Sequence, residues 1–165
     1  MDALTHMKNK GAFSKHIEEL QKQIDDENET PEFAIGVFDC DSLKIVNDDY
    51  GHYKGDIYLK TATHTICNIF KHSPVFRIGG DEFSVILKNE DYRNIDSLLE
   101  MFDKAVDDIN SSAVQPWEQV WISKGFAVYD PSQDNTVTGV IQRADRLMYE
   151  NKRERKKSRN TGMRG

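Results

Sequence analysis

The sequence predicts one α/β domain of the α+β type, in which helices pack on a central mixed β-sheet. With 165 residues, of which 38% are hydrophobic, the chain is long enough for one compact domain and too short for two ordinary ones. Segments with helical periodicity alternate with short apolar runs that are typical of strands. Their order is helix, strand, helix, hairpin, helix, strand and helix. Two crossovers around a central hairpin imply a mixed sheet covered by helices.

The first two predicted elements are a helix and a buried strand. The run 33–38 is nearly all apolar, as expected of a central strand that is covered on both faces. An acidic loop that contains Pro31 separates this strand from the helix before it. The helix has one apolar face, on which residues recur at spacings of four, three and four: Phe13, Ile17, Leu20 and Ile24.

Two aspartates, Asp39 and Asp41, come directly after the buried strand. Sheets of α/β proteins commonly place ligand groups at such strand ends, although a cap on the following loop is the alternative for either aspartate alone. Residues 42–56 form a polar connection too rich in glycine and aspartate for one long helix, and its length favours a functional loop. A second helix is expected from Ile57, with Asp56 as its N-cap.

The stretch 76–87 predicts a β-hairpin that carries charge at its tip. Two runs of strand-forming residues flank Gly79 and Gly80, which can adopt the positive φ angles of a tight turn. Asp81 and Glu82 then open an apolar strand, where desolvation of charge is costly. Either these acids are solvated at the tip or they hold a cation, and this stretch alone leaves both interpretations open.

Three more elements complete the predicted fold. Apolar residues at helical spacing over 95–109 indicate a third helix. The run 120–129 reads as a strand, and a last helix carries its apolar face over 140–148. The segment from residue 152 onward is basic, with seven lysines and arginines and one glutamate, and could contact phosphates or be a solvated helix end.

Composition limits the function classes. Outside the basic tail the chain is acidic, which argues against a nucleic-acid-binding surface. The sequence has no signal peptide and no run long enough to span a membrane, so this segment is expected to be cytoplasmic, on its own or as part of a larger sensor. Cys40 and Cys67 lack metal-site spacing and suit reduced thiols.

Several motifs together resemble the GGDEF family of diguanylate cyclases. The resemblance covers residues 1–157, with 158–165 as a disordered basic tail. It implies a fold like the catalytic palm of nucleotidyl cyclases and polymerases, and condensation of two GTP into cyclic di-GMP and two pyrophosphates. The matching segments are 2–5, 38–44, 47–48, 51–56, 79–83 and 144–149, followed by Lys152.

The resemblance also implies a metal site. Carboxylates that face a triphosphate repel it unless a divalent cation lies between them. By resemblance, the ligands of Mg²⁺, or alternatively Mn²⁺, are Asp39, the backbone carbonyl of Cys40, and Asp81. Glu82 completes the shell of a second metal ion or assists proton removal, so Asp39, Asp81 and Glu82 form the predicted catalytic set.

The phosphates must be held without a P-loop, since no such motif is present. Backbone N–H groups at residues 42–44 and two lysine side chains are the expected holders. The positions assigned to phosphate and nucleotide contacts are Ser42, Leu43, Lys44, His52, Gly79, Gly80, Lys152 and Lys156.

Guanine presents two adjacent donors, N1–H and N2–H₂, which one carboxylate accepts together, and adenine lacks that pair. The resemblance makes Asp56 and Asn47 the guanine contacts, and a buried Asp56 would stay unpaired against adenine. We therefore expect GTP in both half-sites. The alternative for Asp56 is a helix cap only.

The chain departs from the family at two sites. Residues 70–73 lack the Arg-x-x-Asp of the product-inhibition motif, so that site is expected to be absent. Lys156 stands where an arginine would contact phosphate, and lysine lacks the planar guanidinium fork that binds phosphate with two N–H groups.

One GTP per domain implies a homodimer during turnover. No heptad run supports a stable dimer, so the isolated domain is expected to be monomeric and slow, with an upstream sensory or dimerising region missing. A catalytically silent receptor for GTP or cyclic di-GMP is the main alternative. A basic-tailed nucleic-acid binder is the weakest candidate.

Overall fold

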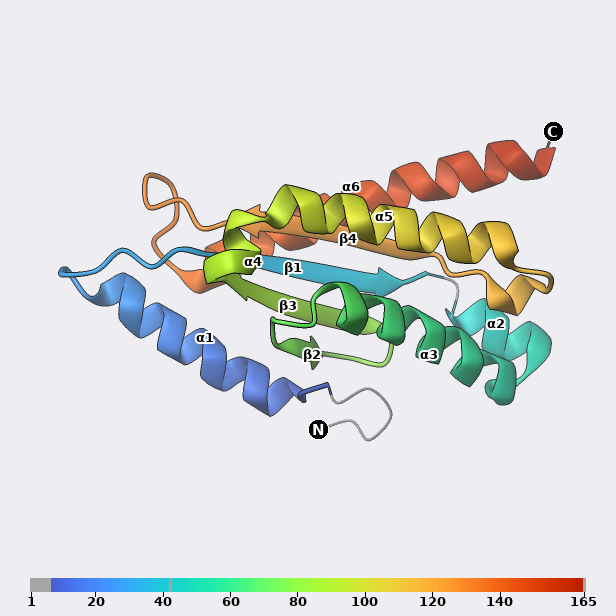
Figure 1. Ribbon diagram of the computed structural model, residues 1–165, viewed down its shortest axis with the longest axis horizontal. Helices are drawn as coiled ribbons and strands as arrows, with labels where there is room; N and C mark the ends of the chain where they lie inside the picture. Colours follow the sequence, from blue (N-terminus) through green and yellow to red (C-terminus); the bar gives the residue numbers. More distant parts are fainter. Residues whose placement is uncertain (1–6, 42, 165) are drawn as a thin grey trace.

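The computed structural model describes residues 7–41 and 43–164, with side chains described up to residue 157 (Figure 1). The opening motif at 2–5 therefore lies outside the described residues. The elements in chain order are α1 (Lys10–Asp25), β1 (Phe33–Cys40), α2 (Leu43–Tyr50), α3 (His52–Ile69), β2 (Val75–Arg77), β3 (Glu82–Lys88), α4 (Asn89–Arg93), α5 (Ile95–Ser112), the 3₁₀ turn η1 (Pro116–Glu118), β4 (Ile122–Val128) and α6 (Val137–Arg164).

The four strands form one sheet in the order β2-β3-β1-β4, and each neighbouring pair is antiparallel. The α+β class and the central hairpin are confirmed, but the expectation of a mixed sheet is wrong for these strands. Each crossover does connect two parallel strands, β1 to β2 and β3 to β4. A strand of opposite direction lies between the members of each pair, which is the split βαβ arrangement. An isolated bridge between Lys8 and Phe76 is parallel.

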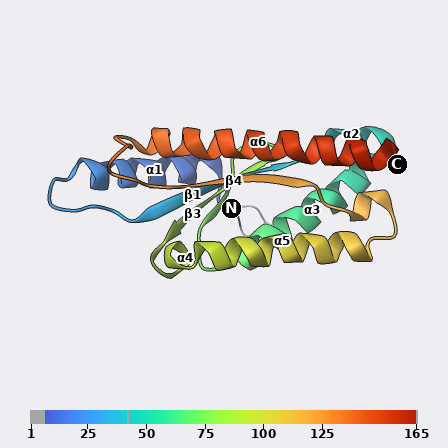
Figure 2. The same ribbon diagram turned by 90° about the horizontal axis from the view of Figure 1, so that it is seen from above.

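Helices cover both faces of the sheet, with α1 and α6 on one side and α3 and α5 on the other (Figure 2). All eight residues of β1 are buried, as predicted for a central strand. Its side chains alternate between the two layers, because successive residues of a strand point to opposite faces. Ile35 packs in the layer of α1 and α6, whereas Phe38 packs in the layer of α3 and α5.

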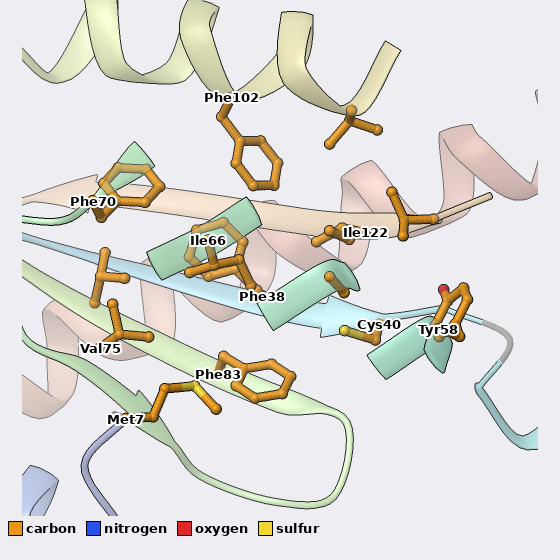
Figure 3. Packing of buried hydrophobic residues seen from close by; sticks show 14 of the residues in the cluster. Met7, Phe38, Cys40, Tyr58, Ile66, Phe70, Val75, Phe83, Phe102 and Ile122 are labelled. Atoms are coloured by element: carbon orange, nitrogen blue, oxygen red, sulfur yellow. The ribbon is translucent and has the colours of Figure 1, made fainter. Parts of the chain in front are cut away.

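Aromatic rings fill the layer between the sheet and helices α3 and α5. The ring of Phe38 lies 5.4 Å from that of Phe102 in α5 and 5.8 Å from that of Phe70 at the end of α3 (Figure 3). All three side chains are fully buried. This packing holds the end of β1 rigidly between the two helices, because close-packed aromatic contacts leave little room for movement.

The connection at 42–56 is more helical than expected. It contains all of α2, and α3 begins at His52 rather than at Ile57. Gly51 separates the two helices with a φ of 88°, which glycine adopts without the strain that a side chain would add. The predicted N-cap role of Asp56 is therefore wrong, since Gly51 occupies that position and Asp56 lies inside α3.

Helix α6 lies unusually close to β4. A Cβ atom on Gly125 would lie 2.1 Å from the carbonyl oxygen of Ala144 and 2.3 Å from the backbone nitrogen of Met148. The helix extends to Arg164, although no side chain beyond residue 157 is described. The boundary at residue 157 and the disordered tail stay predictions.

Among the described residues, no helix is both long enough and apolar enough to cross a membrane.

Candidate active site

Strand pairing brings the two predicted acidic motifs together at one end of the sheet. Asp39 in β1 lies directly opposite Glu82 in β3 and opposite Ser123 in β4. The backbone N–H of Cys40 donates to the carbonyl oxygen of Asp81 at 2.8 Å. The hairpin therefore carries Asp81 and Glu82 to the end of β1, where the sequence predicted that they would meet Asp39.

The hairpin turn is closed by an arginine rather than by positive φ angles. Among the described residues Gly51 is the only glycine with positive φ, so the expectation for Gly79 and Gly80 is wrong. Four residues separate β2 from β3, which relaxes the twist that a two-residue turn would impose. Arg77 donates from Nε to the carbonyl of Gly79 at 3.3 Å and from a terminal nitrogen to that of Gly80 at 2.9 Å.

Asp39 is paired with a cation from α6. The ammonium group of Lys152 donates to Oδ2 of Asp39 at 2.9 Å, and this contact raises the pKa of Lys152. The other oxygen, Oδ1, is buried and has no hydrogen-bond partner among the described residues. Asp39 therefore keeps one acceptor available for a ligand.

Asp41 is more deeply buried, with only 2% of its side chain exposed. Its Oδ2 accepts a hydrogen bond from the Ser123 hydroxyl at 2.6 Å, and Nε of Arg155 lies 3.7 Å from the same oxygen. Burial raises the pKa of Asp41. The backbone here is fixed as well, because the Tyr58 hydroxyl donates to the carbonyl of Asp41.

Glu82 lies in a field of like charge. Burial, followed by the nearby carboxylates of Asp39 and Asp81, raises its pKa. Asp145 of α6 adds to this field and lines a cavity of about 90 Å³ with Glu82. The charge of Lys152 opposes this field at Glu82, and a cluster of carboxylates that is offset only in part favours binding of a cation.

The donor set can be compared with what Mg²⁺ requires, namely oxygen ligands. The unpartnered Oδ1 of Asp39 is such a ligand, and Asp81 and Glu82 are adjacent. The thiol of Cys40 is not an oxygen ligand, and burial raises its pKa and so disfavours the thiolate form. The group predicted to bind the metal at this position is the backbone carbonyl of Cys40. Within the described chain, no three carboxylate, imidazole or thiol side chains already converge on one point.

The predicted guanine contacts lie on two adjoining helices. The Asn47 side chain of α2 rests on Gly55 of α3 so closely that a Cβ there would lie 1.6 Å from Asn47 Oδ1. Asn47 thus lies against the residue that precedes Asp56 in α3. Asp56 is exposed rather than buried, so its carboxylate is hydrated in the nucleotide-free protein.

The predicted phosphate and nucleotide contacts are spread over four segments, one of which is the hairpin turn at Gly79 and Gly80. Lys44 and His52 are exposed, at the starts of α2 and α3, and Leu43 is half-buried. Ser42 lies outside the described residues. Lys152 contacts the carboxylate of Asp39, whereas Lys156 is exposed to solvent.

Arg155 and Asp41 form a contact that the sequence interpretation missed. A signal was available, because Lys152 and Arg155 are three residues apart and share one face of a helix. Asp39 and Asp41 are likewise two residues apart at the end of the predicted strand, a spacing that puts side chains on one face as long as the chain stays extended.

A profile of the family described as "Diguanylate cyclase, GGDEF domain" matches residues 1–158. The chain is 30% identical over 153 residues to "Diguanylate cyclase A" of Treponema denticola, covering 92% of this chain and 41% of the relative. It is 28% identical over 152 residues to "Probable diguanylate cyclase DgcE" of Escherichia coli, covering 92% and 14%. The chain thus spans less than half the length of these relatives.

Solved structures share the fold. The GGDEF domain of DgcB from Caulobacter crescentus, in complex with c-di-GMP, superposes with a TM-score of 0.75 at 24% identity, covering 93% of this chain and 90% of that one. Diguanylate cyclase SiaD of Pseudomonas aeruginosa, in complex with its activator SiaC, gives 0.71 at 22% identity, covering 93% and 58%.

Proposed function

Because this chain belongs to the diguanylate cyclase GGDEF-domain family, we propose that it condenses two GTP molecules into cyclic di-GMP and releases two pyrophosphates. The observation that carries the proposal is the acidic cluster at the end of β1. Asp39 lies opposite Glu82, next to Asp81, and offers a buried oxygen that has no hydrogen-bond partner in the described part of the chain. Asp81 and Glu82 are exposed, so burial does not by itself require a cation, but the neighbouring carboxylates repel one another and a divalent cation between them would relieve that repulsion.

The acids and the lysine have separate roles in this proposal. Asp39, the Cys40 carbonyl, Asp81 and Glu82 would hold Mg²⁺, or Mn²⁺ in its place. When bound, the metal ion offsets the charge of the triphosphate and lowers the pKa of a coordinated hydroxyl. Lys152, already seated on Asp39, offers its ammonium to a phosphate oxygen.

The bond that forms joins the ribose 3′-oxygen of one GTP to the α-phosphorus of the other, and pyrophosphate leaves. The 3′-hydroxyl must lose its proton in this step. We assign this proton to Glu82 as the alternative to a role in the metal shell, and its raised pKa supports the assignment because it brings the carboxylate closer to the working pH than an ordinary glutamate. The reaction then repeats with the two nucleotides in exchanged roles.

Base selection falls to α2 and α3. The Asp56 carboxylate accepts from N1–H and N2–H₂ of guanine, and Asn47, held against Gly55, contacts the same base. Such a bidentate contact discriminates between bases by about 1–3 kcal/mol. Because Asp56 is hydrated in the free protein, discrimination arises when the bound base displaces that water.

The test is to incubate the protein with GTP and Mg²⁺ and to identify the products by chromatography and mass. Asp81→Asn removes one charge from the cluster, and Asp49→Asn removes one from the exposed surface of α2 as a matched control. Cyclic di-GMP from the wild type and Asp49→Asn, with a loss of at least a hundredfold in Asp81→Asn, is the expected result.

The two alternatives give other outcomes. Tight binding of GTP with no product at any protein concentration would identify a silent receptor and overturn the proposal. Product from ATP at a rate similar to that from GTP would contradict the roles of Asp56 and Asn47 alone.

A further inference from the structure

Two cations of α6 face two acids at the end of β1. Lys152 Nζ lies 2.9 Å from Oδ2 of Asp39, and Arg155 Nε lies 3.7 Å from Oδ2 of Asp41. Lys152 and Arg155 are adjacent on one helix face, since residues three apart lie side by side. The two pairs thus form one contact between the helix and the strand end.

Asp41 needs a nearby positive charge more than Asp39 does. Its side chain is only 2% exposed, and the Ser123 hydroxyl supplies one hydrogen bond to it. A buried carboxylate that loses its cationic neighbour keeps its desolvation penalty with nothing to offset it. Arg155 is the cation in ion-pair contact with Asp41, and the nearby ammonium of Lys152 also favours the charged form of this carboxylate.

Arg155 is itself confined. Its side chain is 26% exposed, and its guanidinium carbon lies 5.8 Å from the centre of the Trp121 ring. Its Nε is buried and makes no hydrogen bond within the described chain. A guanidinium held between an aromatic face and a carboxylate has few alternative rotamers, so it fixes the helix turn that carries it.

We propose that Arg155 is a positioning residue, which pairs with Asp41 and thereby holds the turn of α6 that places Lys152 on Oδ2 of Asp39. The effect of this placement on turnover rests on the proposed function, but the placement itself does not. Arg155 stands in this role one position before Lys156, the residue that family resemblance assigned to phosphate.

The direct test measures the access of Lys152 in the protein without nucleotide. An amine-reactive reagent is added in limiting amount, and the labelling rate of each lysine is followed by peptide mass spectrometry. An ammonium seated on a carboxylate is less available than a free one. Arg155→Ala should raise the labelling rate of Lys152 about fivefold, the range expected on loss of such a pair, with Lys10 unchanged as an internal reference.

Arg153→Ala is the matched control, since it removes the same charge from an exposed position on the same helix. It should leave the labelling of Lys152 unchanged, and Arg155→Lys should restore most of the wild-type rate. If Arg155→Ala does not fold, the double variant Asp41→Asn with Arg155→Ala removes the buried charge together with its partner. Faster labelling of Lys152 in that variant supports the proposal equally.

A second readout separates positioning from general destabilisation. Arg155→Ala should weaken binding of a non-reactive GTP analogue about tenfold in the presence of Mg²⁺, and the same change made in Lys152→Ala should have no further effect. Unchanged labelling of Lys152 in folded Arg155→Ala would overturn the proposal, even if cyclic di-GMP is made. Faster labelling without any product would retain it and would reject the proposed function instead.

Discussion

The residues at the end of β1 balance buried charge only in part. Asp39 and Asp41 each have one oxygen that contacts a cation or a hydroxyl and one that is buried without a partner among the described residues. Breaking a buried pair costs about 3–5 kcal/mol, because one charge is left uncompensated. The partly uncompensated charge at this strand end therefore destabilises the folded protein, and a bound cation or nucleotide would reduce that cost. Functional sites commonly carry such a cost.

The histidine that packs on Phe76 gives a residue-scale prediction that is independent of catalysis. The ring of His16 lies 5.1 Å from that of Phe76, and burial, together with the charge of Lys8, lowers the pKa of His16. The unfolded chain therefore binds a proton more readily than the folded one. Stability is present above the ordinary histidine pKa of about 6.5 and is lost as pH falls towards the lowered value.

His16→Gln should remove this part of the pH dependence. The drop in Tm between pH 7.5 and pH 5 is expected to be smaller in His16→Gln than in the wild type, as measured by thermal unfolding followed by circular dichroism. His72→Gln, at an exposed position, is the control and should track the wild type. An equal drop in all three proteins would show that His16 contributes nothing.

At the residue scale the sequence predicted the acids better than their partners. Asp39, Asp81 and Glu82 were placed together by the resemblance to the family, whereas the strand pattern alone left other interpretations open for both acidic motifs. The spacing of Lys152 and Arg155 was a signal for a second pair, but the Asp41–Arg155 contact itself could not be assigned, since it joins residues more than a hundred positions apart and depends on where α6 lies along β4. The exposure of Asp56 was also missed, because the pattern did not show that α3 begins five residues earlier, at His52.

At the scale of elements, α6 is positioned by its close approach to β4. Both cations of the site lie on this helix, and Gly125 allows its backbone to lie against the strand. Close helix–strand packing of this kind is one established use of glycine. The geometry of the site thus depends on a residue with no side chain of its own.

Gly125→Ala should disrupt this approach. Its Cβ would lie 2.1 Å from the Ala144 carbonyl oxygen, so α6 must shift, and the free energy of unfolding is expected to fall by about 2–3 kcal/mol. Cyclic di-GMP production should fall with it, because Lys152 moves away from Asp39. Chemical denaturation gives the first quantity and product analysis the second.

Gly11→Ala is the matched substitution in α1. The nearest atom to its Cβ would be Asn9 Oδ1 at 3.4 Å, and alanine favours the helix by about 0.5–1 kcal/mol, so no loss of stability is expected. If Gly125→Ala is as stable and as active as Gly11→Ala, then α6 is not held by this contact.

Element types were predicted more reliably than element limits. The apolar run of β1 and the periodic faces of α1, α5 and α6 identified these elements directly. The segment 42–56 was expected to be a loop because of its glycines and aspartates, yet one of those glycines, Gly51, is what allows two helices to follow each other. A turn residue between two helices and a residue of an open loop look alike in a sequence.

At the scale of the whole molecule, the order of the strands in the sheet could not be predicted from the sequence pattern. The pattern predicted the order of elements along the chain and the two crossovers. It could not show that an antiparallel strand lies within each crossover pair, because that choice depends on how the hairpin inserts beside β1. The consequence is functional, since this insertion brings Glu82 opposite Asp39.

The described residues bring one acidic cluster together at the end of β1, and the proposed product, cyclic di-GMP, contains two guanylate units. Under the proposed function each copy of the domain supplies one GTP, and two copies meet with their acidic ends facing each other. Encounter of two separate domains makes the reaction second order in protein. A coiled coil or an activator that holds two copies together would remove this dependence.

The most direct test of this account is the rate of cyclic di-GMP formation per mole of protein, measured over a hundredfold range of protein concentration with GTP and Mg²⁺ in excess. We expect this specific rate to rise in proportion to protein concentration in the lower part of the range. It should then level off once most of the protein is dimeric. A specific rate that is the same at every concentration would contradict turnover between two facing copies of a monomeric domain. The absence of cyclic di-GMP throughout would contradict the cyclase itself.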